Sequence, residues 1–233
     1  MSGVDERGQG VSRRRVLTLG VGALAWLAAG HGLGAPAGDQ DPRVTKILAL
    51  WATFARESSN LLARYTSTRT SPLLREPLVG SGALAFVAPN RLVLRDDGAT
   101  GSTTRIEPRA IAITPNDPSL PRRPLPSRAE APALRWLADH LLACFAPGDG
   151  SALIDDARVE VPRGRTKQLR LLPPRDSSAR ALIRTVTLTL EQVGGAVLSI
   201  EIAQSDGGTY KLALADHRQQ VEAELVDRVI SGS

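Results

Sequence analysis

The residues of this 233-residue chain that could perform acid-base chemistry are few and scattered. Histidine is the usual general base near neutral pH, and two histidines, His140 and His217, lie beyond the amino-terminal segment that holds His31. His140 follows Asp139 in a stretch of helical period, so we expect it on a helix surface or at the edge of a lid. Asp216-His217 predicts the end of a strand, followed by a turn and the start of a helix.

None of these residues has the spacing of a catalytic or cofactor motif. The chain has no Gly-x-Ser-x-Gly elbow. Asp155 and Asp156 are adjacent, so in a strand they would point to opposite faces, and we interpret them as the start or end of a strand. Gly148-Asp149-Gly150 lacks a following lysine and opens no nucleotide-binding unit. We therefore predict that the protein has no catalytic residues, no cofactor and no metal site, and that it is not an enzyme.

Cys144 is the only cysteine, so neither an intrachain disulfide nor a Cys/His metal cluster can form. The string Leu141-Leu142-Ala143-Cys144 matches a lipoprotein-processing site superficially, but it lies far from the amino terminus. We expect Cys144 to be a small apolar residue on the inner face of a helix.

The composition predicts a sizeable core in an ordinary globular domain. Apolar residues make up 42% of the chain and aromatic residues only 3%, so the core must consist of Leu, Val, Ile and Ala. The net charge is +5, without a basic stripe interleaved with aromatics, which argues against a nucleic-acid partner. No apolar run reaches the roughly 20 residues that span a bilayer.

The amino terminus has the three parts of a cleavable export signal. Residues 12–18 read Ser-Arg-Arg-Arg-Val-Leu-Thr, an apolar stretch follows, and small residues come at Ala35-Pro36-Ala37. We predict that residues 1–37 are this signal, cleaved near Ala37, and that residues 38–233 form a single domain in the periplasm. The pair Arg13-Arg14 resembles a twin-arginine signal. Val16 and Thr18 depart from that motif, so the Sec route stays open. The alternatives to a cleaved signal are an uncleaved membrane anchor and a basic tail on a cytosolic protein.

The periodicity of the remaining chain predicts an α+β domain in the order helix, strands, helix, strands, helix. Helical spacing covers 44–55 and 130–145, and a tail from 217 to 233 predicts one short helix. Alternation predicts an early hairpin, two short strands, and a late antiparallel meander whose apolar face the helices must cover. The expected strands are 83–88, 91–95, 103–108, 110–114, 185–190, 198–202 and 210–214.

The order of several motifs resembles one known family, the periplasmic outer-membrane lipoprotein carriers with the LolA-like fold. The resemblance covers roughly residues 44–216. The segments that carry it are collinear with the family's pattern: Pro77-Leu78-Val79-Gly80-Ser81-Gly82-Ala83-Leu84 running on to Leu92, Leu171-Leu172-Pro173-Pro174, Ile183 to Leu190, Leu198 to Ile202, and Asp206-Gly207-Gly208-Thr209.

The resemblance implies an incomplete, half-open antiparallel β-barrel around an apolar cavity that is closed by lid helices. Such a carrier, a chaperone in protein transport, shelters the acyl chains of a lipoprotein or lipid, whose exposure to water costs about 0.8 kcal/mol per CH₂. It implies an inner-membrane donor complex and an outer-membrane acceptor as partners, and we expect a monomer. The predicted cavity residues are Leu84, Phe86, Leu92, Leu94, Leu188, Leu190, Ile200, Ile202, Leu212 and Leu214. The predicted lid residues are Leu134, Leu137, Leu141 and Phe145, with Trp136 beside that face.

One position departs from the family. The carriers commonly have an arginine directly before the proline of the early hairpin, where this chain has Ala88, and neither Arg91 nor Arg95 takes that place. The departure makes a lipid or glycolipid cargo an alternative to a lipoprotein. Two other functions stay open: a ligand-sensing regulatory module of the same fold, and an esterase acting on envelope lipids. A second domain after the barrel would favour the sensing module.

Overall fold

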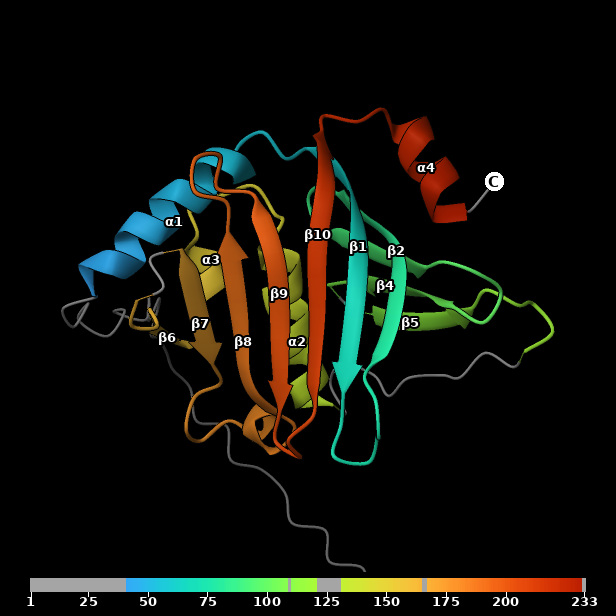
Figure 1. Cartoon of the computed structure of the whole chain (residues 1–233). Helices are drawn as coiled ribbons and strands as arrows, with labels where there is room; N and C mark the ends of the chain where they lie inside the picture. Colours follow the sequence, from blue (N-terminus) through green and yellow to red (C-terminus); the bar gives the residue numbers. More distant parts are fainter. Residues whose placement is uncertain (1–40, 109, 121–130, 165–166, 232–233) are drawn as a thin grey trace, which may run out of the picture. The chain divides into compact units, whose positions relative to one another are not determined.

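The structure is a computed structural model that describes residues 41–108, 110–120, 131–164 and 167–231 (Figure 1). The predicted export signal and its cleavage site lie outside these residues. In chain order the elements are α1 (Pro42–Ala55), β1 (Asn60–Thr70), β2 (Leu78–Val87), β3 (Arg91–Asp96), β4 (Ser102–Glu107), β5 (Ala110–Pro115), α2 (Pro132–Ala143), α3 (Ser151–Ile154), β6 (Arg158–Glu160), β7 (Gln168–Leu172), the 3₁₀ helix η1 (Ser178–Ala181), β8 (Ile183–Leu190), β9 (Val197–Gln204), β10 (Thr209–Gln219) and α4 (Ala223–Ser231).

The strands form one open antiparallel sheet in the order β5-β4-β3-β2-β1-β10-β9-β8-β7-β6. The order describes two meanders, β1 to β5 and β6 to β10, that meet where β1 pairs with β10 (Figure 1). The α+β fold class predicted from the sequence, an incomplete antiparallel barrel with covering helices, is confirmed.

Strand alternation separates an apolar face from a largely polar one, because successive side chains point to opposite faces of a sheet. In the early hairpin Leu84 is paired with Leu94 and Phe86 with Leu92, and in the late meander Leu188 is paired with Ile200. These pairs share the concave face. The early hairpin, the two short strands and the late meander all form as the alternation predicts.

The two amphipathic helices cover the concave face, as predicted. In the view of Figure 1, α2 passes behind β8 to β10. The tail helix α4 lies instead on the opposite face, where Val221 and Val226 pack on Leu62, Ala85 and Val93 of β1, β2 and β3. The sequence predicts this helix but not its place.

The prediction for Asp216-His217 is wrong, because β10 does not end there. The strand continues to Gln219, and its register with β1 shifts between Leu62 and Arg64. Asp216 has φ 55°, so a bulge absorbs the shift and the strand goes on. Asp155 and Asp156 lie in the turn after α3, shortly before β6 begins at Arg158.

Helix α1 is packed against the β8–β9 turn with its backbone. Gly195 in that turn has φ 77°, and a Cβ at this position would lie 2.0 Å from the carbonyl oxygen of Leu50. The turn can approach the helix this closely only because Gly195 has no side chain. The absence of a side chain at Gly195 therefore permits α1 to lie directly against this turn.

We predict that Gly195→Ala lowers the free energy of unfolding by at least about 3 kcal/mol, because a left-handed φ and a steric clash act together. Gly98→Ala is the matched control, since Gly98 has φ 79° and nothing within 4 Å of its Cβ position. It should cost about 1 kcal/mol. Urea denaturation of both variants measures the difference. Equal losses would mean that the contact with α1 is unimportant.

Candidate functional site

The predicted cavity residues come together on the concave face. Nine of the ten are at most 7% exposed, and Leu94 is half-buried. All belong to or pack against one apolar core that also includes side chains of α1 and α2. Phe86 of β2 meets Phe145, which follows α2, with their ring centroids 6.4 Å apart. In this structure the interior is packed, with the helices closed onto the sheet.

Sequence reasoning missed the contribution of β1 and β7 to this interior. Leu61, Ala63 and Tyr65 of β1 are buried, and Leu169 and Leu171 of β7 are 1% and 0% exposed. The alternation of both segments carries the signal. It is short, however, and in β1 it gives way to the polar run from Thr66 to Thr70.

Helix α2 lies between the two ends of the open sheet. It contacts β3 and β4 on one side, and η1 and α3 on the other. Two indole groups hold it: Trp51 of α1 donates its Nε1–H to the carbonyl oxygen of Cys144 at 3.0 Å, and Trp136 donates to that of Asp156 at 2.8 Å. The helix therefore closes the open side of the incomplete barrel.

The predicted lid residues are buried to different degrees. Leu141 and Phe145 are buried, whereas Leu134 and Leu137 are half-buried. Trp136 and His140, expected beside this face and at the surface, are only 4% and 3% exposed, so the expectation for His140 is wrong. The reason is that α2 is covered on two sides, by the sheet and by the segment from α3 to Asp156, which sequence periodicity cannot predict.

A hollow of about 720 Å³ runs along α2, within the size range of small-molecule sites. Helix α2 lines it through Arg135, Trp136, Asp139 and Leu142, and Ala146, just beyond the helix, continues the wall. The β2–β3 turn, the β4–β5 turn, α3 and the residues before η1 complete the wall. An apolar floor with a polar rim is suited to an amphipathic ligand.

The hollow holds histidine and serine side chains, but they are not arranged as in a hydrolase. His140 donates from Nδ1 to the carbonyl oxygen of Trp136 at 2.7 Å, where a catalytic histidine would donate to a carboxylate. The Ser177 hydroxyl accepts the backbone N–H of Ala179, capping η1. His140 Nδ1 and the Ser177 hydroxyl therefore have structural partners, whereas His140 Nε2 is buried with no hydrogen-bond partner among the described residues.

The other residues with reactive side chains are structural too. His217 Nε2 lies 2.9 Å from the carbonyl oxygen of Val197, and its ring meets Phe54 edge-on. Cys144 is fully buried, which raises the pKa of its thiol, as expected for a small apolar core residue. Within the described ranges no three His, Cys, Asp or Glu side chains are grouped to hold a metal ion.

The two arginines near the early hairpin are directed toward α4. Arg91 lies 3.8 Å from Asp227, and Arg95 donates to the carbonyl oxygen of Ile230 at 3.3 Å. The backbone N–H of Ala88 donates to the carbonyl oxygen of Ser59 at 2.8 Å. Neither arginine therefore replaces the one that the carriers commonly have at the position of Ala88.

Comparison with known proteins gives likenesses in structure only. No protein-family model matches the chain, and no curated protein gives a significant match. Among solved structures, the chain is similar to a LolA superfamily protein from Nitrosomonas europaea, with 11% identity over 78% of this chain and 95% of that chain and a TM-score of 0.41. It is also similar to the lipoprotein LppX from Mycobacterium tuberculosis, with 15% identity, 78% and 99% coverage and a TM-score of 0.41. A DUF1329 family protein from Desulfovibrio piger is 10% identical, with 80% and 100% coverage and a TM-score of 0.42.

One of these solved structures is a member of the LolA superfamily, which the sequence also resembles. In the parts of the chain that the structure describes, no helix is long and apolar enough to cross a membrane.

The buried His140 predicts a pH dependence of stability. Burial lowers its pKa, while the Trp136 carbonyl and the charges of Asp139 and Asp156 act against this. Below the ordinary histidine pKa of about 6.5 the unfolded chain binds a proton that the folded chain resists. The free energy of unfolding is therefore highest above this pH and decreases as the pH falls below it. The slope for one proton is at most about 1.4 kcal/mol per pH unit.

His140→Phe keeps a ring beside Trp136 and removes the titrating group. We expect its unfolding free energy, measured by urea denaturation between about pH 5.5 and 7.5, to change less with pH than that of the wild type. Identical slopes in both proteins would assign the pH dependence to other groups.

Proposed function

We propose that this domain is a periplasmic carrier that shelters the acyl chains of a lipid or lipoprotein for transfer to the outer membrane. The observation that carries the proposal is a single apolar interior on the concave face of an open sheet, closed by a helix that fills its open side. Opening of α2 would replace helix–sheet contacts with contacts to acyl chains. The walls of such a site must be apolar, since acyl chains offer no hydrogen bonds.

The interior has the chemistry that acyl chains require. The buried polar residues of the described chain are Ser58, Ser67 and His140. Ser58 donates its hydroxyl to the carbonyl oxygen of Phe54. His140 is bonded to Trp136 through Nδ1, while its Nε2 is buried without a hydrogen-bond partner among the described residues, in the wall of the hollow along α2. An interior of this kind favours a long apolar chain over a polar ligand, because a buried polar group without a partner is costly.

Helix α2, and not α1, is the element that we propose to move. The backbone of α1 lies directly against the β8–β9 turn at Gly195, and moving α1 would open that packing. Two indole–carbonyl hydrogen bonds hold α2, and a neutral hydrogen bond contributes about 1 kcal/mol net. The hollow along α2 also leaves space beside the helix.

The positions around the early hairpin favour a lipid or glycolipid over a lipoprotein as cargo. Ala88 replaces the arginine that the resemblance leads one to expect, and Arg91 and Arg95 are engaged by α4. We further propose that residues 1–37 direct export, that residues 38–233 act as one domain and as a monomer, and that the protein is a carrier and not an enzyme.

The first test is acyl-chain binding by face-specific variants. Ile200 is 1% exposed on the concave face, and its neighbour Ser199 points to the other face of β9. We expect Ile200→Asp to abolish binding of a fluorescent fatty acid, because an isolated buried charge is costly. Ser199→Asp should bind as the wild type does.

Ile200→Ala guards against simple unfolding, since it should cost about 2–5 kcal/mol and leave binding detectable. If folded Ile200→Asp binds the probe like the wild type, the interior is not the acyl-chain site. Circular dichroism shows which variants are folded.

The second test concerns the lid. Hydrogen exchange should be faster in residues 131–146 than in residues 185–215, and added lipid should slow exchange in α2, because bound chains would hold the helix in one place. Trp51→Phe removes the hydrogen bond to Cys144, which contributes about 1 kcal/mol. Its loss should raise the exchange rate of α2 several-fold. Slow exchange of α2 that lipid does not change would make it a permanent part of the core.

A further inference from the structure

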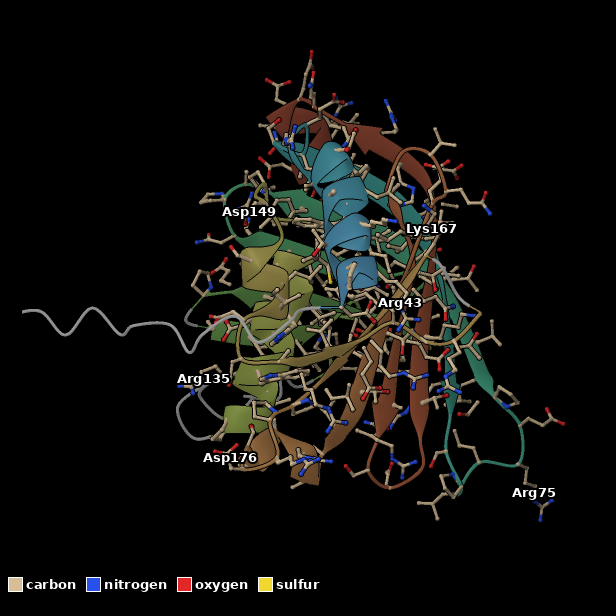
Figure 2. The ribbon with its side chains drawn as sticks, turned by 90° about the vertical axis from the view of Figure 1, so that its left-hand side faces the viewer. Arg43, Arg75, Arg135, Asp149, Lys167 and Asp176 are labelled. Carbon is tan, nitrogen blue, oxygen red and sulfur yellow. The ribbon has the colours of Figure 1, made fainter. Side chains whose placement is uncertain are left out.

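One end of the sheet presents apolar side chains to water on a projecting hairpin. The β1–β2 loop extends beyond the sheet, and Figure 2 shows Arg75 at its tip, directed away from the rest of the domain. Leu73 in this loop is 94% exposed, and Leu78 and Val79 at the start of β2 are 55% and 71% exposed. Exposed apolar groups that cluster in this way usually mark an interaction site.

The same edge continues through two further segments. The β9–β10 turn adjoins the hairpin, since a Cβ at Gly207 would lie 3.4 Å from Pro72. Hydrogen bonds join the β9–β10 turn to the end of η1. The backbone N–H of Ser205 donates to the carbonyl oxygen of Leu182 at 3.1 Å, and the Ser205 hydroxyl donates to the carbonyl oxygen of Arg180 at 2.7 Å. Leu182 is 57% exposed. Both figures place these three segments at the lower end of the domain.

Arginines accompany the exposed leucines along this edge. Four of them are exposed and take part in no ion pair with another described residue: Arg75, Arg175, Arg180 and Arg184. Three exposed carboxylates, of Glu76, Asp176 and Asp206, accompany them, so the edge has an excess of positive charge. We call residues 71–79, 175–184 and 205–207 the docking edge.

We propose that the docking edge binds the surface of a bilayer that contains anionic phospholipid. Leucine side chains on a projecting turn can enter the acyl region, while the flanking guanidinium groups bind lipid phosphates. The shape favours a bilayer over a protein partner. Leu73 lies on a protrusion and not in a groove or on a flat face, and a bilayer accepts a protrusion without a complementary pocket.

The docking edge also meets one end of the hollow along α2. Ser177 and Ser178, between Arg175 and Arg180, line that hollow. A lipid leaving a bilayer at this edge could therefore pass beside α2 without crossing open water. This route rests on the proposed function, whereas binding of the edge to a bilayer does not depend on it.

Vesicle flotation with the full chain tests the proposal. We expect binding to vesicles of phosphatidylcholine with phosphatidylglycerol that exceeds binding to phosphatidylcholine alone and weakens with salt. Leu73→Asp and Arg180→Glu should each lower binding to the anionic vesicles by about tenfold. The matched control is Val193→Asp, because Val193 is 87% exposed in the β8–β9 turn at the opposite end of the sheet. It should bind as the wild type does.

Fatty-acid binding in solution, measured on the same variants, separates the two proposals. If Leu73→Asp retains both fatty-acid binding and wild-type vesicle binding, the docking edge is wrong and the carrier function stands. Loss of vesicle binding in Val193→Asp equal to that in Leu73→Asp would also overturn the docking edge. So would sedimentation showing that Leu73→Asp converts a dimer to a monomer, because the leucines would then join two copies of this chain. If vesicle binding depends on Leu73 but the protein binds no fatty acid, the docking edge is supported and the proposed carrier function is wrong.

Discussion

The pairing of β1 with β10 is the interaction on which the rest of the structure depends. It joins the strands from Leu61 and Gln219 at one end to Thr70 and Thr209 at the other, and so turns two meanders into one ten-stranded sheet. Without it each meander would have an apolar face too small to enclose anything. With it the apolar faces become continuous, and the sheet curves around one interior. The bulge at Asp216 adjusts the register so that β10 extends beyond the core and places His217 against Phe54.

A sheet that does not close needs a cover, and the two covers are held by different means. The backbone of α1 is closely packed against the β8–β9 turn, and moving the helix would expose that packed surface. The contacts of α2 are side-chain packing and two hydrogen bonds to main-chain carbonyls, at Cys144 and Asp156. Such contacts can be broken and remade without unfolding the sheet. This difference in attachment is the basis of the proposal that α2 opens while α1 stays in place.

The polar side chains of the interior stabilise the boundaries of the core. Tyr65 donates its hydroxyl hydrogen to Asp96 at 2.7 Å, and burial together with this carboxylate raises the pKa of Tyr65. Its ring occupies the space that a side chain at position 82 would need, so glycine there is a condition of the packing. His140 is bonded along its own helix through Nδ1, and its ring lies against that of Trp136, tilted by 32°, with the ring centroids 4.0 Å apart. The Tyr65 hydroxyl and His140 Nδ1 face partners in the protein, and the rest of the concave face is apolar.

The sequence by itself determined the elements whose signal is local. Alternation from Ala83 to Arg95 and from Thr185 to Leu214 predicted the hairpins and the residues of the concave face, and helical period predicted α1, α2 and α4. Tertiary structure decided what those signals leave open. The partner of β1 lies at the far end of the chain, so no local pattern could select it. The burial of His140 depends on α3 and the turn after it, and the place of α4 on the convex face depends on Leu62, Ala85 and Val93 coming together from three strands. Periodicity shows which face of an element is apolar, but only the packing of distant segments decides what that face meets.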